Sequence, residues 1–260
     1  MSIENDQSNV EVRTGSSEPS TDSVNQNTFD CVANVIRIRK TKKVLADPNH
    51  PVQASDGSRE QLNKTDCANN ERVRQAIELA GWAPFHYERN VDGLAEPWRF
   101  HVLWRDQCKK IAKLMPTWFD DMKPNNKLPA MLSACGALVL VNWLPQFAGT
   151  VTDTDESVSK EKRLQIDEEH LAATAVAVQN MMLALTAGGL GTYWSSGGMF
   201  RTPIMFEKLG TGPNERLLAA IFVDYGGQHT NDAVTERIAG KHRNSRSHFE
   251  KWTREIEFDL

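Results

Sequence analysis

The chain has 260 residues, of which 40% are hydrophobic and 25% charged, with a formal net charge of −4. These values are typical of one sizeable globular domain with appendages, and they argue against a nucleic-acid-binding protein. The longest apolar run, residues 134–144, is too short to span a membrane. The four scattered cysteines contain no C-x-x-C pair, which predicts a reducing, cytoplasmic location and neither a metal site nor a disulfide framework.

Residues 1–30 are polar and acidic. Six acidic residues stand there against one basic residue, Arg13, and almost no side chain is large and apolar. Such a segment cannot bury enough surface to fold, so we expect a disordered acidic tail followed by one domain over residues 31–260.

Order is predicted to begin near Phe29 with a helix that runs through Ile36. The helix leads into residues 37–43, RIRKTKK, which hold five cations in seven positions. One interpretation is a solvated basic turn. The other is an anion site, because cations beside a threonine hydroxyl suit a phosphate.

Residues 48–69 are rich in polar residues, Gly and Pro, and are predicted to form a surface excursion. Residues 70–81 have helical spacing. The aromatic and polar loop that follows, residues 82–90, contains His86 and Asn90, and loops after helix ends often carry function. Residues 98–104 alternate as a half-buried strand does.

The middle of the chain alternates ordered and irregular segments. Residues 106–115 are predicted to form a short helix and residues 136–144 a central strand. Residues 116–130 have no clear period but contain Trp118 and Phe119, so they are either a mobile flap or a loop anchored by two aromatic rings. Residues 145–166 are predicted to be a second polar excursion.

Residues 167–198 are the most informative stretch. Asp167 is a candidate N-cap for a helix that ends at Gly188 and is apolar on both sides, as buried helices are. Residues 191–198, GTYWSSGG, are predicted to form a short strand and a turn open to a ligand. An ordinary connection between core elements is the alternative. A Rossmann motif does not fit, since these glycines follow a helix rather than a strand.

The last third contains two clear elements and a tail. Thr202 and Gly210 bracket a short helix that begins at Pro203. Residues 217–225 are a strongly apolar strand. The tail is basic from residue 240 and then alternates apolar residues up to Phe258.

Taken in order, these segments resemble the FMN-dependent nitroreductase family from about Val32 to Arg243. The resemblance rests on Arg39-Lys40-Thr41-x-Lys43, Ala83-Pro84 followed by Pro97-Trp98-Arg99-Phe100, the helix with Gln179-Asn180, the Gly-Leu-Gly-Thr-Tyr-Trp-Ser-Ser-Gly-Gly run, and Lys241-x-Arg243. Thr41 stands where the family usually has serine, and the loop between Pro84 and Pro97 is longer than usual.

This resemblance implies an α+β fold with a mixed, mainly antiparallel sheet flanked by helices. It also implies an intertwined homodimer with two FMN sites at the interface, in which residues 244–260 pack on the partner subunit. The helix that is apolar on both sides suits a dimer core.

The implied cofactor-binding residues fall into three groups. Cations and a hydroxyl would hold the phosphate, the residues after the central helix would flank the ring, and two residues of the long loop would lie nearby. They are Arg39, Lys40, Thr41, Lys43, Lys241 and Arg243; Trp194, Ser195, Ser196, Gly197 and Gly198; and His86 and Asn90. No catalytic side chain is implied, because flavin N5 carries the chemistry.

The resemblance implies an oxidoreductase that takes hydride from NAD(P)H to FMN and reduces a small-molecule electron acceptor such as a nitroaromatic or a quinone. Alternatives are a specialised member of the fold, such as a reductive dehalogenase or a flavin-fragmenting enzyme with residues 116–130 as its lid, or a flavin-binding protein without turnover. No nucleic-acid or membrane partner is expected.

Overall fold

Six strands form one mixed sheet in the computed structural model, which describes residues 26–46, 56–120, 122–123, 126–147, 158–226, 234–239 and 246–256. The order across the sheet is β2-β3-β5-β4-β1-β6. The strands are β1 (Thr41–Ala46), β2 (Trp98–Trp104), β3 (Ala137–Trp143), β4 (Gly191–Ser195), β5 (Arg216–Asp224) and β6 (Val234–Ala239). All neighbours are antiparallel except β1 and β4, which confirms the predicted mixed sheet.

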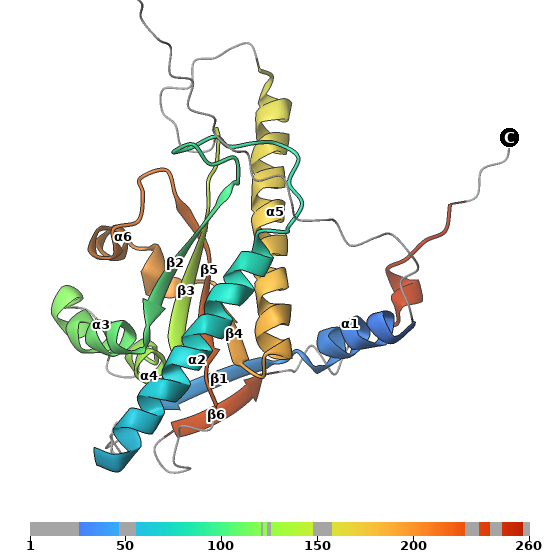
Figure 1. Ribbon diagram of the computed structural model, residues 1–260. Coiled ribbons are helices and arrows are strands. Elements are labelled where there is room, and N and C mark those ends of the chain that lie inside the picture. The colour runs from blue at the N-terminus through green and yellow to red at the C-terminus, as the bar shows by residue number, and fades with distance from the viewer. Residues whose placement is uncertain are drawn as a thin grey trace, which may run out of the picture.

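Helices cover both faces of the sheet (Figure 1). The longer ones are α1 (Gln26–Ile38), α2 (Asp56–Ala80), α3 (Arg105–Trp118) and α5 (Lys160–Ala187); the shorter ones are α4 (Leu128–Ala134), α6 (Pro203–Leu209) and the 3-10 turns η1 (Gly198–Arg201) and η2 (Phe249–Lys251). Side chains of α2 and α5 share one hydrophobic cluster with the sheet, and those of α3, α4 and α6 share the other.

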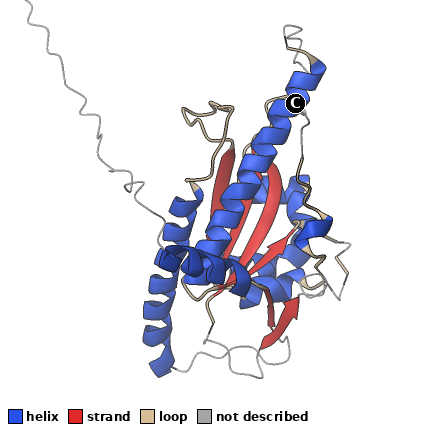
Figure 2. Ribbon diagram, turned by 90° about the vertical axis from the view of Figure 1, so that its right-hand side faces the viewer, coloured by secondary structure: helices blue, strands red, loops and turns tan. Residues whose placement is uncertain are grey.

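The central strands explain why the core has two halves. Along β3, Val139 and Val141 face the cluster of α2 and α5, while Leu138 and Leu140 face the cluster of α3, α4 and α6. Successive side chains of a strand point to opposite faces, so a strand covered on both sides is apolar throughout. Figure 2 shows α5 lying lengthwise over the strands.

Helix α5 begins earlier than predicted. Its N-cap is Ser159, whose hydroxyl accepts a hydrogen bond from the Lys162 N–H at 3.2 Å, so Asp167 is not the cap. Asp167 is instead buried within the helix and accepts hydrogen bonds from the backbone N–H groups of Gln146 and Phe147, at 2.7 and 3.2 Å. By length and composition α5 could cross a membrane, but it is the core helix of this fold.

Three other boundaries differ from the predictions. Helix α2 already begins at Asp56, within the segment predicted to be an excursion, and α3 continues through Pro116 to Trp118. Helix α1 begins at Gln26, so residues 26–30 are helical; residues 1–25 lie outside the described part. Phe119 is buried in the cluster of α3, α4 and α6, and Trp118 is partly buried against it. These contacts favour an anchored loop over a mobile flap for residues 116–130.

Helix α1 projects from the body, and the described C-terminal residues form an extended arm (Figure 1). No residue of α1 is buried, and Phe29, Val32 and Ile36 each expose more than half of their surface. The arm, residues 246–256, likewise exposes Trp252 by 72%. These apolar side chains lie on the outside of a single chain.

Candidate functional site

Strand β4 connects the two segments that the sequence marks as a binding site. Near its start, Thr192 pairs in parallel with Thr41, the first residue of β1. Its other end leads directly into the turn at Ser196. Four residues of extended chain separate Thr192 from Ser196, or about 13 Å. The cationic segment and the glycine turn therefore lie at opposite ends of one short strand.

The cationic segment is the junction of α1 and β1 rather than a basic turn. The Arg39 N–H donates to the Val35 carbonyl at 3.0 Å and closes the last turn of α1. Lys40 is exposed, while Arg39 and Thr41 are partly exposed. Two cations and a hydroxyl thus precede and open the strand, which is a donor set that suits an anion.

The next two lysines make contacts within the protein. Lys42 Nζ lies 2.7 Å from a carboxylate oxygen of Asp224 at the end of β5. Lys43 Nζ lies 4.9 Å from the centre of the Tyr193 ring, a cation–π contact with β4. Lys43, one of the predicted phosphate ligands, therefore lies beside β4.

The turn after β4 is held in an unusual backbone conformation. Gly197 and Gly198 have φ angles of +107° and +51°, which few residues other than glycine adopt. The Ser195 hydroxyl accepts a hydrogen bond from the Gly197 N–H at 3.3 Å. A Cβ on Gly197 would lie 2.5 Å from Leu217, whereas one on Gly198 would have no atom within 4 Å among the described residues beyond its chain neighbours. The turn therefore has a packed side and an open side.

Two further residues define the turn. Trp194 is partly buried against the cluster of α2 and α5, opposite Ile221. Arg201, which the sequence analysis did not single out, donates from Nε to the Ser196 carbonyl at 2.5 Å and from Nη2 to the Leu218 carbonyl at 3.2 Å. No local pattern identifies Arg201, because its partners come from two other segments.

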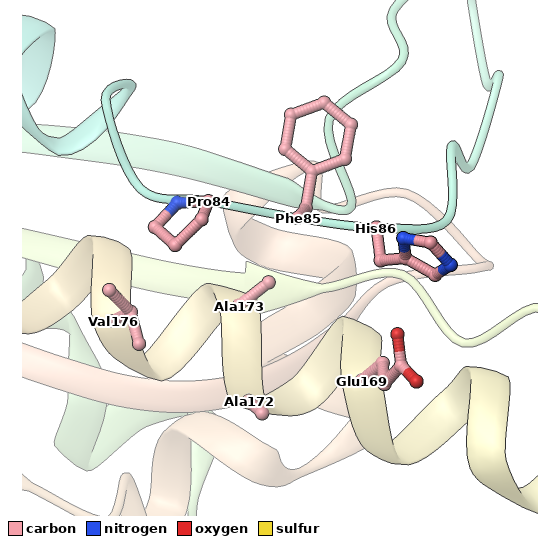
Figure 3. Close-up of a pocket in the computed structure, with 7 residues that line it drawn as sticks. All are labelled: Pro84, Phe85, His86, Glu169, Ala172, Ala173 and Val176. Atoms are coloured by element: carbon pink, nitrogen blue, oxygen red, sulfur yellow. The ribbon is translucent and has the colours of Figure 1, made fainter.

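A separate open groove lies between the loop after α2 and the middle of α5 (Figure 3). Its volume is about 440 Å³, and its lining residues are Pro84, Phe85, His86, Glu169, Ala172, Ala173 and Val176. Three small or branched apolar side chains of α5 form one wall, and His86 and Glu169 make one end polar. His86 was predicted from sequence as a site residue, whereas Glu169 was not.

Asn90 does not line this groove. Its amide nitrogen donates to Glu88 at 3.0 Å, and its backbone has a positive φ of 49°. Its predicted role as a cofactor ligand therefore has no counterpart in this groove. The loop that carries it is fixed by Arg99, which donates to the carbonyl groups of Val91 and Glu96 at 2.8 and 3.0 Å.

A buried histidine of α5 joins that loop to the end of β3. His170 is 1% exposed, and its Nδ1 and Nε2 atoms lie 3.2 and 3.0 Å from the carbonyl oxygens of Leu144 and Tyr87. Burial lowers the pKa of His170 more strongly than the two carbonyl groups raise it. In its neutral form the imidazole donates to only one of these two carbonyl oxygens, and its other nitrogen lies beside the second.

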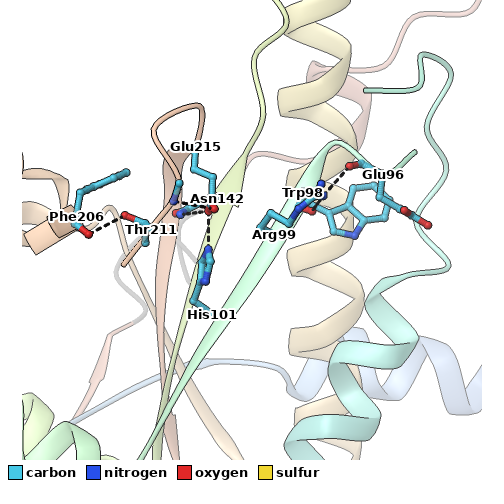
Figure 4. A network of polar contacts seen from close by, with 9 residues as sticks. Glu96, Trp98, Arg99, His101, Asn142, Phe206, Thr211 and Glu215 are labelled. Carbon is cyan, nitrogen blue, oxygen red and sulfur yellow. Dashed lines mark hydrogen bonds and ion pairs between the residues drawn. The ribbon is translucent and has the colours of Figure 1, made fainter. Parts of the chain in front are cut away.

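A second polar network ties the start of β5 to β2 and β3 (Figure 4). Glu215 Oε2 lies 2.5 Å from His101 Nε2 and 2.6 Å from the amide nitrogen of Asn142, and Oε1 accepts from the Gly212 N–H at 3.0 Å. Burial opposes ionisation of Glu215, but these three contacts together outweigh it and lower the pKa. The network fixes the loop before β5.

The remaining predicted ligands, Lys241 and Arg243, lie outside the described residues. Within the described ranges, no group of three or more His, Cys, Asp or Glu side chains is placed to hold a metal ion. The described site thus consists of the cationic junction, strand β4, the glycine turn and the groove.

Comparison with known proteins gives the family. A model of the Nitroreductase family matches residues 59–226. A nitroreductase-like family protein from Bacillus cereus has a TM-score of 0.55 and 20% identity, over 87% of this chain and 96% of that one. A putative nitroreductase in complex with FMN from Desulfovibrio desulfuricans has a TM-score of 0.48 and 19% identity, over 88% of this chain and 98% of that one. An iodotyrosine deiodinase bound to FMN and 3-iodo-L-tyrosine has a TM-score of 0.42 and 15% identity, over 78% of this chain and 91% of that one. No curated protein sequence matches significantly.

The mixed sheet, its two helical layers and the glycine turn after the central helix define an α+β protein of nitroreductase-like fold. The family model covers more than half of the 260 residues. The chain belongs to the nitroreductase family.

Proposed function

We propose that this protein is an FMN-dependent oxidoreductase that takes hydride from NAD(P)H and reduces a small-molecule acceptor such as a nitroaromatic or a quinone. The observation that carries the proposal is the arrangement along β4. A pair of cations and a hydroxyl lie at Thr41, beside Thr192 on β4, and the open glycine turn begins at Ser196, about 13 Å from Thr192 along that strand. FMN likewise has a phosphate at one end and a flat ring at the other.

The residues at the start of β1 fit the phosphate. A phosphate monoester carries about −1.5 to −2 charges at neutral pH. Arg39 and Lys40 supply two positive charges there, and Thr41 supplies a hydroxyl. Each charge-assisted hydrogen bond contributes roughly 1.5–3 kcal/mol, so a few of them hold the cofactor without a covalent bond. Lys43, Lys241 and Arg243 complete the proposed phosphate site.

The turn after β4 fits the ring. The described residues leave space beside Gly198 where a side chain would stand, so a flat molecule can approach the backbone. Bound FMN would supply the N5 atom that accepts and returns hydride. The protein groups at Ser195, Ser196 and Gly197 would then position and polarise the ring. No nucleophilic side chain is needed.

We also propose that the functional unit is an intertwined homodimer in the cytoplasm. Helix α1 presents Phe29, Val32 and Ile36 on one apolar stripe, and the C-terminal arm presents Phe249 and Trp252. Exposed apolar groups that are too many for an isolated chain favour burial against a second copy. Residues 244–260 would pack on that copy.

The first test is the cofactor content of the purified protein. Yellow protein that releases FMN, and no other flavin, on denaturation supports the proposal. Colourless protein that does not take up added FMN contradicts it.

The second test is turnover. Steady-state oxidation of NADH and NADPH is measured with a nitroaromatic, a quinone and a halogenated phenol as acceptors. FMN-loaded protein that reduces the first two supports the proposed reaction. Selective release of halide from the phenol would favour the dehalogenase alternative, and absence of turnover with FMN bound would favour a binding protein.

A further inference from the structure

The guanidinium group of Arg201 reaches back from η1 and holds the glycine turn. Its Nε donates to the Ser196 carbonyl at 2.5 Å, and its Nη2 donates to the Leu218 carbonyl on β5 at 3.2 Å. A guanidinium is a rigid planar fork, so these two bonds fix the distance between the turn and the central strand. The aliphatic part of Arg201 also packs 3.3 Å from where a Gly197 Cβ would lie.

These contacts act on one peptide group. The Ser196 carbonyl and the Gly197 N–H belong to the same peptide and point in opposite directions. The carbonyl is held by Arg201, and the N–H is held by the Ser195 hydroxyl at 3.3 Å. Gly197, which has a φ of +107° and no side chain, would otherwise leave this peptide free to rotate. Both of its ends are fixed instead.

We propose that Arg201 is a positioning residue of the flavin site: it fixes the orientation of the Ser196–Gly197 peptide against the ring and places a permanent positive charge behind that peptide. The inference rests on the proposed function. A charge next to the flavin changes its electronics, and a cation favours the reduced form because that form is the more anionic at neutral pH.

The first arm of the test uses FMN-free protein and hydrogen exchange of the backbone amides. Arg201→Met should raise the exchange rate of the Gly197 amide about tenfold, the effect of losing roughly 1.4 kcal/mol of local stability. Arg201→Lys should fall between, since an ammonium keeps one bond but not the fork. The matched control is Lys208→Met, because Lys208 is an exposed cation on α6 that lies 3.6 Å from the neighbouring Glu207 carboxylate.

The second arm measures FMN-loaded protein. If Arg201→Met weakens binding of reduced FMN ten times more than binding of oxidised FMN, the two-electron potential falls by about 30 mV. Arg201→Lys should keep most of the potential, because it keeps the charge, while its Gly197 amide still exchanges faster than in the unaltered protein. Lys208→Met should change neither quantity.

The outcomes separate the inference from the proposed function. Unchanged Gly197 exchange in Arg201→Met overturns the positioning role even when FMN binds normally. A potential that falls equally in Lys208→Met assigns the effect to net charge and overturns the electrostatic role. An unaltered protein that takes up no FMN refutes the proposed function, and the exchange arm still decides whether Arg201 holds the peptide.

Discussion

Lys42 and Asp224 form an ion pair that joins β1 to the end of β5, with Nζ 2.7 Å from a carboxylate oxygen. The Asp224 side chain is 4% exposed and that of Lys42 is 25% exposed. The other carboxylate oxygen of Asp224 accepts a hydrogen bond from the Gly226 N–H at 3.2 Å. Lys42 is therefore a structural cation within a run that otherwise suits an anion.

This asymmetry in burial predicts which substitution costs more stability. Lys42→Met removes the cation that faces a buried carboxylate and should lower the free energy of unfolding by roughly 3 kcal/mol. Asp224→Asn should cost less, because the freed ammonium can reach water. Urea unfolding of both variants measures the difference. Equal losses, or none, would show that the pair does not stabilise the sheet.

Arg39→Ala should weaken FMN binding about ten- to a hundredfold while the apoprotein stays folded. The reason is the loss of one charge-assisted contact, worth roughly 1.5–3 kcal/mol. Fluorescence titration of FMN into apoprotein measures the change. Lys42→Ala is unsuitable as a control, because Lys42 pairs with Asp224. Arg37, exposed in the last turn of α1, is the better control. Equal FMN affinity in Arg39→Ala and Arg37→Ala would show that residues 37–43 are a solvated basic segment and not an anion site.

His170 should make the protein less stable below neutral pH. Its pKa in the folded state lies below the ordinary value of about 6.5 because of burial. Between those two pKa values the unfolded chain binds more protons, so the free energy of unfolding falls as pH falls, by up to about 1.4 kcal/mol per pH unit. Asp167 opposes this shift and Arg89 adds to it. Denaturant unfolding at pH 7.5, 6.5 and 5.5 measures the slope.

The matched variants for that slope are His170→Gln and His248→Gln. His170→Gln removes the titrating group, so the stability curve should flatten over this range. His248, exposed and 3.1 Å from Glu250, serves as the matched surface histidine. A slope that survives in His170→Gln would have to come from other groups.

Gly136→Ala should destabilise the protein by about 2–3 kcal/mol. A Cβ there would lie 2.3–2.5 Å from ring atoms of Tyr225. That ring cannot move easily, since its hydroxyl donates to Asn70 and the Arg105 guanidinium lies 5.3 Å from the ring centre. Overpacking of this kind typically costs about 1–3 kcal/mol.

The control for that substitution is Gly188→Ala. Gly188 has a φ of −76°, and a Cβ there would meet no atom closer than 3.4 Å, which is ordinary contact. The melting temperature of Gly188→Ala should therefore be close to that of the unaltered protein. Similar melting temperatures for both glycine variants would show that the packing around Tyr225 can yield.

The elements that the sequence predicted correctly are those with local signals at both ends. Helix α6 spans Pro203–Leu209 as expected, because Thr202 caps it and Gly210 ends it in the left-handed region. Strand β2 likewise spans Trp98–Trp104. The predicted start of α5 at Asp167 is wrong. Aspartate is a common N-cap residue, but Asp167 lies inside the helix and accepts a hydrogen bond from the Gln146 N–H of another segment.

The site follows the same rule. Residues 39–43 form one unbroken segment, and residues 194–198 form another. The composition of each segment therefore predicts binding residues without knowledge of the fold. The groove and Arg201 depend on contacts between distant segments. Glu169 faces His86 across the groove only because α5 passes under the loop after α2 (Figure 3). Such proximity is set by packing, which composition does not reveal.

The hydrogen bond from the Arg39 N–H to the Val35 carbonyl makes α1 and the cationic segment one continuous piece. If a second copy covers the apolar stripe of α1, dimer formation and FMN retention share that piece and are linked by mass action. Diluting the loaded protein below its dimer dissociation constant would then release FMN, and excess FMN would drive reassociation. The loaded fraction in a cell would rise with the abundance of the protein itself.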